Sequence, residues 1–216
     1  GAGGAVATKT YVDDIFSTYV YTGNGSARSI NNGIDLSGEG GMVWIKKRNS
    51  ATGGNSHIAD TARGITKYLT SNENYAELTD ANRTSATTSQ GFSLGTVTTV
   101  NNNNDTYASW SFAKSKGFFD VVTYTQSGSA GSARTIDHNL GCVPGFIMLK
   151  QTTGTENWVC YHRDLAAYKH LTLNSSSAAG GDANSGIYNV TSTQFTVGSD
   201  NNGVGTYVAY IFAGGE

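Results

Sequence analysis

The chain has 216 residues, with 14 basic and 16 acidic side chains and a formal net charge of −2. Charged residues make up only 14% of it, which argues against binding to nucleic acid or to an anionic membrane surface, because both draw on clustered lysine and arginine. No segment approaches the ~18 consecutive apolar residues of a membrane span. Aromatic residues at 11% and 28 glycines favour a packed β protein with many turns.

The first half predicts strands and almost no helix. Residues 1–10 are rich in glycine and alanine and are predicted to be a linker or a cut edge. Short apolar or alternating runs bounded by glycine and asparagine then predict strands. The run "GMVWIKK" is apolar on both alternating faces, so we expect a central strand covered on both sides. The run "TYASWSFA" alternates serine with larger side chains, and we expect it nearer an edge or a wet face. These strands are predicted at 14–21, 41–47, 91–97 and 106–113.

The second half repeats the order of the first. "YTGNGSARSI" at 21–30 returns as "YTQSGSAGSARTI" at 124–136, and "GMVWIK" returns as "GFIMLK". We infer a tandem duplication of one antiparallel β-sandwich module, jelly-roll or lectin-like, with modules at 11–113 and 118–216. The alternative is a single sandwich whose two sheets resemble each other, since a duplicate can also fuse around one shared core. The second set of strands is predicted at 118–125, 145–151, 157–162, 194–199 and 206–213.

No catalytic, metal or cofactor site is predicted. Hydrolysis of glycans typically needs two carboxylates roughly 5 to 9.5 Å apart in a cleft, whereas the acidic residues are scattered along the chain. No "GxSxG" nucleophile elbow is present, and the histidines and cysteines lack the spacing of zinc sites. The asparagine-rich stretches 101–105 and 199–203 offer oxygen ligands for calcium, but tight turns favour the same residues. Cys142 and Cys160 are predicted to be free thiols.

Two features are candidate sites. In "DTARG", a charge-assisted hydrogen bond between Asp60 and Arg63 would pin the loop before a strand around Tyr68, and we interpret the pair as a structural clasp rather than a ligand site. The two halves differ most at 72–90 and 175–193, which we expect to be surface loops. Any ligand or host contact is therefore assigned to these loops, with Tyr75 and Tyr188 as the candidate residues.

The motifs also resemble a known family. "TYVDDIFSTYVYTGNGSARSINNGIDLSGEGGMVWIKKR", "DTARG", "FFDVVTYT" and "HNLGCVPGFIMLK", in this order, resemble a module of virion proteins of tailed bacteriophages, particularly marine ones, found in tail fibre and related surface proteins. The resemblance covers nearly all of 11–213. It implies a non-enzymatic structural or host-recognition role on the virion, outside the cell.

Fibre modules of this kind commonly assemble as trimers. The resemblance therefore implies a homotrimer that contacts other virion proteins and a glycan of the host surface. The alternative is a secreted carbohydrate-binding domain of lectin type, which would have a similar fold and would more often be monomeric.

Overall fold

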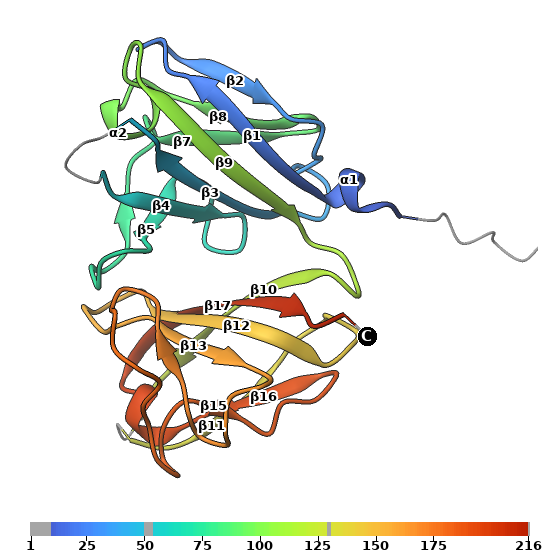
Figure 1. Cartoon of the computed structure of the whole chain (residues 1–216), viewed down its shortest axis with the longest axis vertical. Coiled ribbons are helices and arrows are strands. Elements are labelled where there is room, and N and C mark those ends of the chain that lie inside the picture. Colours follow the sequence, from blue (N-terminus) through green and yellow to red (C-terminus); the bar gives the residue numbers. More distant parts are fainter. Residues whose placement is uncertain (1–9, 50–53, 129–130, 216) are drawn as a thin grey trace, which may run out of the picture.

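Strand pairing divides the chain into four antiparallel sheets (Figure 1). The computed structural model describes residues 10–49, 54–128 and 131–215. Within these residues the protein is all-β, as predicted, with two short α-helices and one 3₁₀-helix. None of its described helices has the length and apolar character needed to span a membrane. The predicted linker falls, except for Thr10, outside the described residues.

The first half forms a six-stranded sheet facing a three-stranded sheet. Alternating side chains of both sheets, such as Val43, Ile45 and Phe92, point inward and form one buried cluster. The helices are α1 (Val12–Ile15) and α2 (Thr98–Asn101). The large sheet has the order β1 (Phe16–Thr22), β9 (Thr106–Ala113), β3 (Gly41–Lys47), β4 (Ser56–Asp60), β5 (Lys67–Thr70), β6 (Leu78–Thr79), and the small sheet has the order β2 (Arg28–Asn31), β8 (Gly91–Leu94), β7 (Thr84–Thr88).

The second half forms a five-stranded sheet facing a three-stranded sheet. Its inner faces contribute Leu149, Val159 and Phe195 to a second buried cluster. A 3₁₀-helix, η1 (Ser199–Asn201), leads into the last strand. The large sheet has the order β10 (Phe119–Gln126), β17 (Gly205–Ala213), β12 (Pro144–Gln151), β13 (Val159–His162), β14 (Leu171–Thr172), and the small sheet has the order β11 (Arg134–Asp137), β16 (Gln194–Val197), β15 (Ile187–Tyr188).

Corresponding strands hold the same places in the two halves. Strand β3 lies between β9 and β4, and β12 lies between β17 and β13. Both are central and covered on their two faces, as predicted. The similar segments 21–30 and 124–136 form the same cation–π contact in each half. Arg28 lies over the ring of Tyr21, and Arg134 lies over the ring of Tyr124. This agreement supports the proposed duplication, while the boundary between modules at 114–117 stays a prediction.

A third apolar cluster joins the two halves. The outer faces of the two large sheets meet, and Met42 of the first half and Met148 and Tyr210 of the second are at most 1% exposed there. Trp158 is fully buried, and its Nε1 donates hydrogen bonds to the carbonyl oxygens of Thr70, at 3.0 Å, and Glu73, at 3.2 Å. The halves therefore share a core in addition to their own.

Some expected elements differ from the structure. Strand β9 is not at an edge, because it pairs with both β1 and β3. Its serines face inward, and Ser111 is fully buried and accepts a hydrogen bond from Asn32 Nδ2 at 2.8 Å. A short hydroxyl side chain with a partner is as easily buried as an alanine. The supposed loops 72–90 and 175–193 contain strands β6 and β7, and β15, so neither is a loop throughout.

Candidate functional site

The two residues assigned to a clasp lie at the contact between the halves. Asp60 ends β4 and is fully buried, and the side chain of Arg63 is 3% exposed. Arg63 Nε donates to Asp60 Oδ2 at 2.6 Å, and its backbone N donates to Oδ1 at 2.8 Å. Both oxygens of one carboxylate thus hold the turn that follows β4.

The same cluster reaches across to the second half. The hydroxyl of Tyr210, in β17, donates to Asp60 Oδ2 at 2.6 Å and accepts from Arg63 Nη2 at 3.1 Å. Arg63 Nη1 pairs with Glu77 Oε2 at 2.9 Å. Burial raises the pKa of Tyr210 well above its usual range, so this hydroxyl keeps its proton and acts as a donor. Every charged member has a partner inside the cluster, which fits a structural role.

The two candidate tyrosines are not brought together. Tyr75 lies between β5 and β6 of the first half and is 48% exposed. Tyr188 lies in β15 of the second half and is half-buried. Its ring contacts Tyr168 edge-on, with ring centroids 5.0 Å apart, and both rings line a shallow surface pocket with Tyr161. These residues therefore form no single site.

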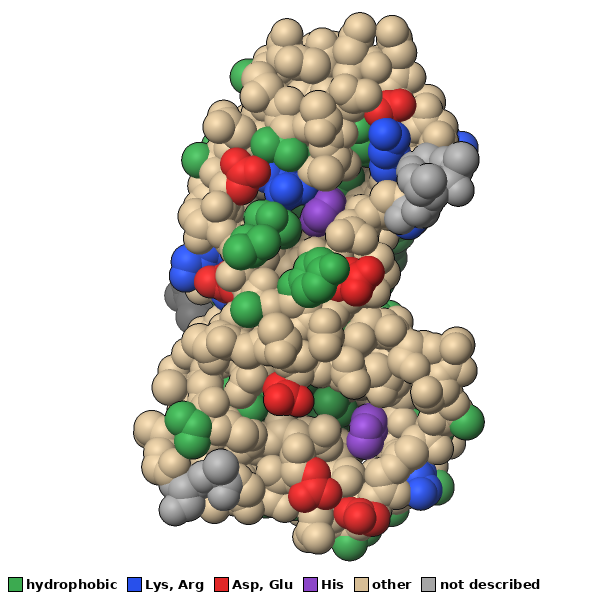
Figure 2. All heavy atoms as spheres, turned by 90° about the vertical axis from the view of Figure 1, so that its left-hand side faces the viewer, with side chains coloured by type: hydrophobic (Ala, Val, Ile, Leu, Met, Phe, Trp, Pro, Cys, Tyr) green, Lys and Arg blue, Asp and Glu red, His purple; other side chains and the backbone are tan. Residues whose placement is uncertain are grey.

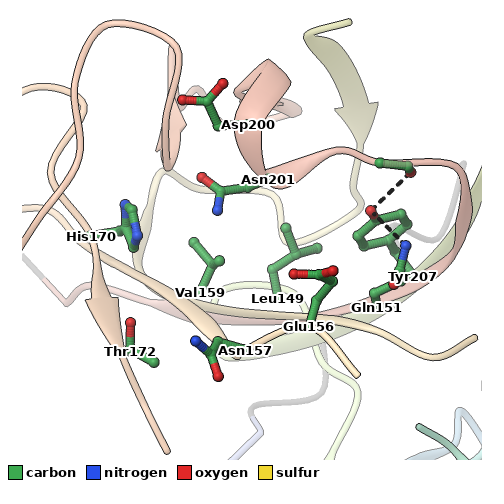
Figure 3. A pocket seen from close by; sticks show the side chains of 11 residues that line it. Leu149, Gln151, Glu156, Asn157, Val159, His170, Thr172, Asp200, Asn201 and Tyr207 are labelled. Carbon is green, nitrogen blue, oxygen red and sulfur yellow. Dashed lines mark hydrogen bonds between the residues drawn. The ribbon is translucent and has the colours of Figure 1, made fainter. Parts of the chain in front are cut away.

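A more enclosed pocket opens at one end of the second half, between the large sheet and η1 (Figure 3). Its volume is about 240 Å³. The floor is apolar because it belongs to the inner face of the sandwich, with Leu149, Val159 and Tyr207 contributed by three neighbouring strands. The rim is polar because it comes from strand ends and connections: Gln151, Glu156, Asn157, His170, Thr172, Asp200 and Asn201.

Negative charge dominates the rim. Glu156 and Asp200 are both exposed carboxylates, and no lysine or arginine is among the described residues that line the pocket. Asp200 Oδ2 accepts a hydrogen bond from Ser185 Oγ at 3.1 Å. Figure 2 shows the corresponding face of the molecule, where acidic side chains and a histidine surround a hollow in the lower half.

Hydrogen bonds fix the floor of the pocket. Gln151 Nε2 donates to the hydroxyl of Tyr207 at 3.2 Å, and that hydroxyl donates to the carbonyl oxygen of Gly203 at 2.9 Å (Figure 3). A ring and an amide held in this way keep their orientation when a ligand enters, so the pocket is preorganised.

The imidazole of His170 forms one side of the pocket and is neutral at neutral pH. Burial, with a smaller effect of Lys169, lowers its pKa below the usual value. The ring packs against glycine backbone, since a Cβ on Gly181 would lie 2.9 Å from His170 Nδ1. A larger residue at Gly181 would therefore push the ring out of place.

Most pocket residues escaped the sequence analysis; Asp200, Asn201 and Gly203 belong to the stretch 199–203, which was considered there as a calcium site or a turn. A further signal exists. The tetrapeptides "DANR" at 80–83 and "DANS" at 182–185 repeat three residues and differ at the fourth. They lie inside the two segments that were judged most divergent. A comparison of the halves residue by residue would have singled out Arg83 and Ser185.

The described part of the chain contains no group of three or more histidine, cysteine, aspartate or glutamate side chains that could hold an ion. The asparagine-rich stretch 101–105 begins at the last residue of α2 and uses its polar groups internally. Asn101, fully buried, accepts from the backbone N of Asn24 at 3.1 Å and donates to the carbonyl oxygens of Ser26 and Gly95. This arrangement is that of a turn.

Fold and site together define an all-β protein of stacked antiparallel sheets with a polar pocket at the end of one sandwich. The chain belongs to the DUF7483 family, a domain of unknown function, whose family model matches residues 12–216. No curated protein and no solved structure matches it.

Proposed function

We propose that the chain is a non-enzymatic structural and adhesion protein of a virus particle, part of a tail fibre or another surface appendage of a tailed bacteriophage. The resemblance of its motifs to such proteins supports the virion assignment. The pocket at the end of the second half carries the adhesion part. Sites built from strand ends and loops on a fixed β scaffold are typical of binding proteins.

The contact between the halves supports the structural part. A particle appendage has to keep its domains aligned, and here the large sheets share an apolar cluster. The clasp of Asp60, Arg63 and Tyr210 adds buried polar contacts across the same junction. The partners proposed are two further copies of the chain in a homotrimer, other virion proteins and a glycan of the host surface.

Antibodies raised against the chain test the virion assignment. They should label the tail appendages of phage particles that encode this sequence, in electron micrographs of purified virions. If the chain is instead recovered from the culture medium and is absent from the particles, the alternative of a secreted lectin-type domain is favoured. Light scattering adds an independent readout, because a trimer has three times the mass of the chain.

Binding to cells tests the adhesion role. The fluorescently labelled chain should bind host bacteria saturably, and unlabelled chain should compete. The double variant Glu156→Gln with Asp200→Asn should lose most of this binding. Asp164→Asn, which removes a carboxylate 81% exposed in another turn, is the matched control. Equal loss in both variants would contradict the assignment of adhesion to the pocket.

A further inference from the structure

The segment that carries Arg83 in the first half carries Ser185 and Gly186 in the second. Asp80 Oδ1 accepts from the backbone N of Asn82 at 2.9 Å, and Asp182 Oδ1 accepts from the backbone N of Asn184 at 3.0 Å. The backbone carbonyl of each asparagine lies against a glycine: Asn82 against Gly95, and Asn184 against Gly198. A Cβ added to either glycine would lie 2.3 Å from that carbonyl oxygen. The backbone N of Arg83 and of Ser185 each donates to the carbonyl oxygen of the aspartate three residues earlier. However, Gly95 N donates to the carbonyl oxygen of Arg83, whereas Gly198 N donates to that of Gly186. The second half therefore has one extra residue here, and Ser185 with Gly186 stands in place of Arg83.

The side chain of Arg83 fills the interior of the first half. Arg83 is 7% exposed, and its Cζ lies 3.9 Å from the centroid of the Tyr68 ring. Its Nη1 donates to Thr99 Oγ1. The buried ring of His57 is a further neighbour, because the positive charge of Arg83 contributes to its lowered pKa after the larger effect of burial. The guanidinium is thus surrounded by aromatic rings, a hydroxyl and the carboxylate of Asp80, whose Oδ2 lies 3.8 Å from Nη2.

The neighbours of Arg83 correspond to residues that line the pocket of the second half. His57 pairs with Thr70, as Val159 pairs with Thr172, so Val159 takes the place of His57. Thr70 and Thr172 therefore correspond. The residues two positions before them, Tyr68 and His170, correspond as well. Thr99, two positions before the buried Asn101, corresponds to Asp200, two before the buried Asn202.

The pocket is therefore the space that a guanidinium occupies in the first half. Ser185 is not among the residues that line the pocket; its short side chain stops at the rim, where the hydroxyl bonds to Asp200 at 3.1 Å. In the first half a more open pocket of about 290 Å³ lies at the corresponding place, lined by Lys47, Gly54, Asn55, Thr98, Thr99 and Asn102.

The charged residues at the entrance of the pocket also differ between the two halves. Lys47 and Gln151 both pair with the tyrosine of the last strand, Tyr107 and Tyr207, and so correspond. The second half thus has a neutral amide in place of a lysine and adds two carboxylates. In Figure 2 basic, acidic and histidine side chains lie close together in the upper half, and acidic side chains and a histidine lie around the hollow below.

We propose that the pocket of the second half binds a guanidinium group carried by a ligand. Glu156 and Asp200 supply the negative charge, and guanidinium donors match carboxylate oxygens in a planar geometry. His170 supplies a flat neutral ring where Tyr68 stacks on Arg83. A planar cation fits this slot better than a tetrahedral ammonium. The inference deepens the proposed function, on which it rests only for the presence of the ligand on a host surface.

Titration of the full chain with ethylguanidinium chloride, followed by amide chemical shifts, tests the proposal. Matched sodium chloride serves as the control for ionic strength. Amides around the pocket, such as those of Gly186, Asn201 and Gly203, should shift saturably, with a dissociation constant on the order of 1 mM. Ethylammonium and galactose should bind about tenfold more weakly or not at all. An acetylated, amidated Gly-Arg-Gly peptide shows whether the group is also accepted from a protein chain.

Variants make the result specific to the pocket. Asp200→Asn and Glu156→Gln should each weaken ethylguanidinium binding about tenfold, and Ser185→Arg should abolish it. Asp164→Asn should leave it unchanged. Shifts that only follow salt, equal binding of ethylammonium, or equal weakening by Asp164→Asn would overturn the proposal. If Ser185→Arg fails to fold, the two carboxylate variants decide. Guanidinium binding without cell adhesion would retain this inference and remove the adhesion proposal, and adhesion without guanidinium binding would do the reverse.

Discussion

At the scale of single residues, His57 has a pKa that its surroundings lower strongly. Burial, and then the charges of Arg83 and Lys46, lower its pKa from 6.5 to about 3. The folded protein therefore keeps the ring neutral, whereas the unfolded chain takes up a proton once the pH falls below 6.5. The contribution to stability is complete above that pH and is lost progressively as the pH falls toward 3.

His57→Val tests this, since valine stands at the corresponding position of the second half. Between pH 7.5 and pH 5 the wild type should lose about 2 kcal/mol of stability that the variant retains. Urea unfolding of both proteins at the two pH values measures the difference, and comparison with the variant cancels the carboxylates they share. Parallel loss of stability in both would show that His57 becomes protonated without a penalty.

Asp60 gives a second prediction at this scale. Asp60→Ala leaves the guanidinium of Arg63 and the hydroxyl of Tyr210 buried without their main acceptor, so we expect a loss of about 3 to 5 kcal/mol. His162, which pairs with β12 as Asp60 pairs with β3, is the matched control. Its side chain is 48% exposed, and His162→Ala should cost less than about 0.5 kcal/mol. Denaturant unfolding of the two variants would contradict the account if their costs were equal.

The two cysteines give a third prediction at the scale of single residues. Both are free; Cys142 is half-buried, while Cys160 is 2% exposed and burial raises its pKa to about 12. In the native protein at pH 8, a thiol reagent should label Cys142 and spare Cys160, since the thiolate is the reactive form. Unfolding without reductant should expose both. Labelling of neither in the unfolded chain would mean that they are bridged.

At the scale of elements, periodicity identified the strands whose inner residues are large and apolar. The central strands β3 and β12 were predicted closely for this reason. Strand β4 was missed because it contains Ser56, His57 and Asp60, all buried. Its polar groups are stabilised by partners far away in the sequence, such as Tyr210 for Asp60, and no local pattern indicates such contacts.

Contacts between residues far apart in the sequence also limited the prediction of the clasp and of the pocket. The close pairing of Asp60 with Arg63 could be anticipated, because the two residues are three apart. The pocket brings together strand ends, the region around η1 and the segment before β14, which only the fold makes neighbours. One local signal was the repeated "DAN", after which the two halves differ.

Trp158 gives a prediction for the element that joins the halves. It precedes β13, is fully buried, and donates to carbonyl oxygens of the first half. Trp158→Ala should cost about 3 to 5 kcal/mol and speed hydrogen exchange in β5 as well as in β13, because both flank the shared cluster. Hydrogen exchange measured by mass spectrometry tests this. Faster exchange confined to the second half would show that the halves are stabilised independently.

At the scale of the whole molecule, the two halves have similar strand orders but differ in what they bury and what they leave open. The first half uses its charged residues inside: Arg83 fills its interior, and Asp60 and Arg63 lock the junction. The second half lacks both arrangements at the corresponding positions, where it has Ser185 and His162. It keeps its acidic groups on the rim of an open pocket. We interpret the first half as scaffold and the second as the half that binds.

The crystal structure of the Ser185→Arg variant tests the central claim most directly, namely that the pocket is the space that Arg83 fills in the first half. The account predicts that the introduced guanidinium enters the pocket, stacks on His170 and bonds to Asp200, as Arg83 stacks on Tyr68 and bonds to Thr99, with the sheets unmoved. An introduced side chain that points into solvent and leaves the pocket open would contradict it.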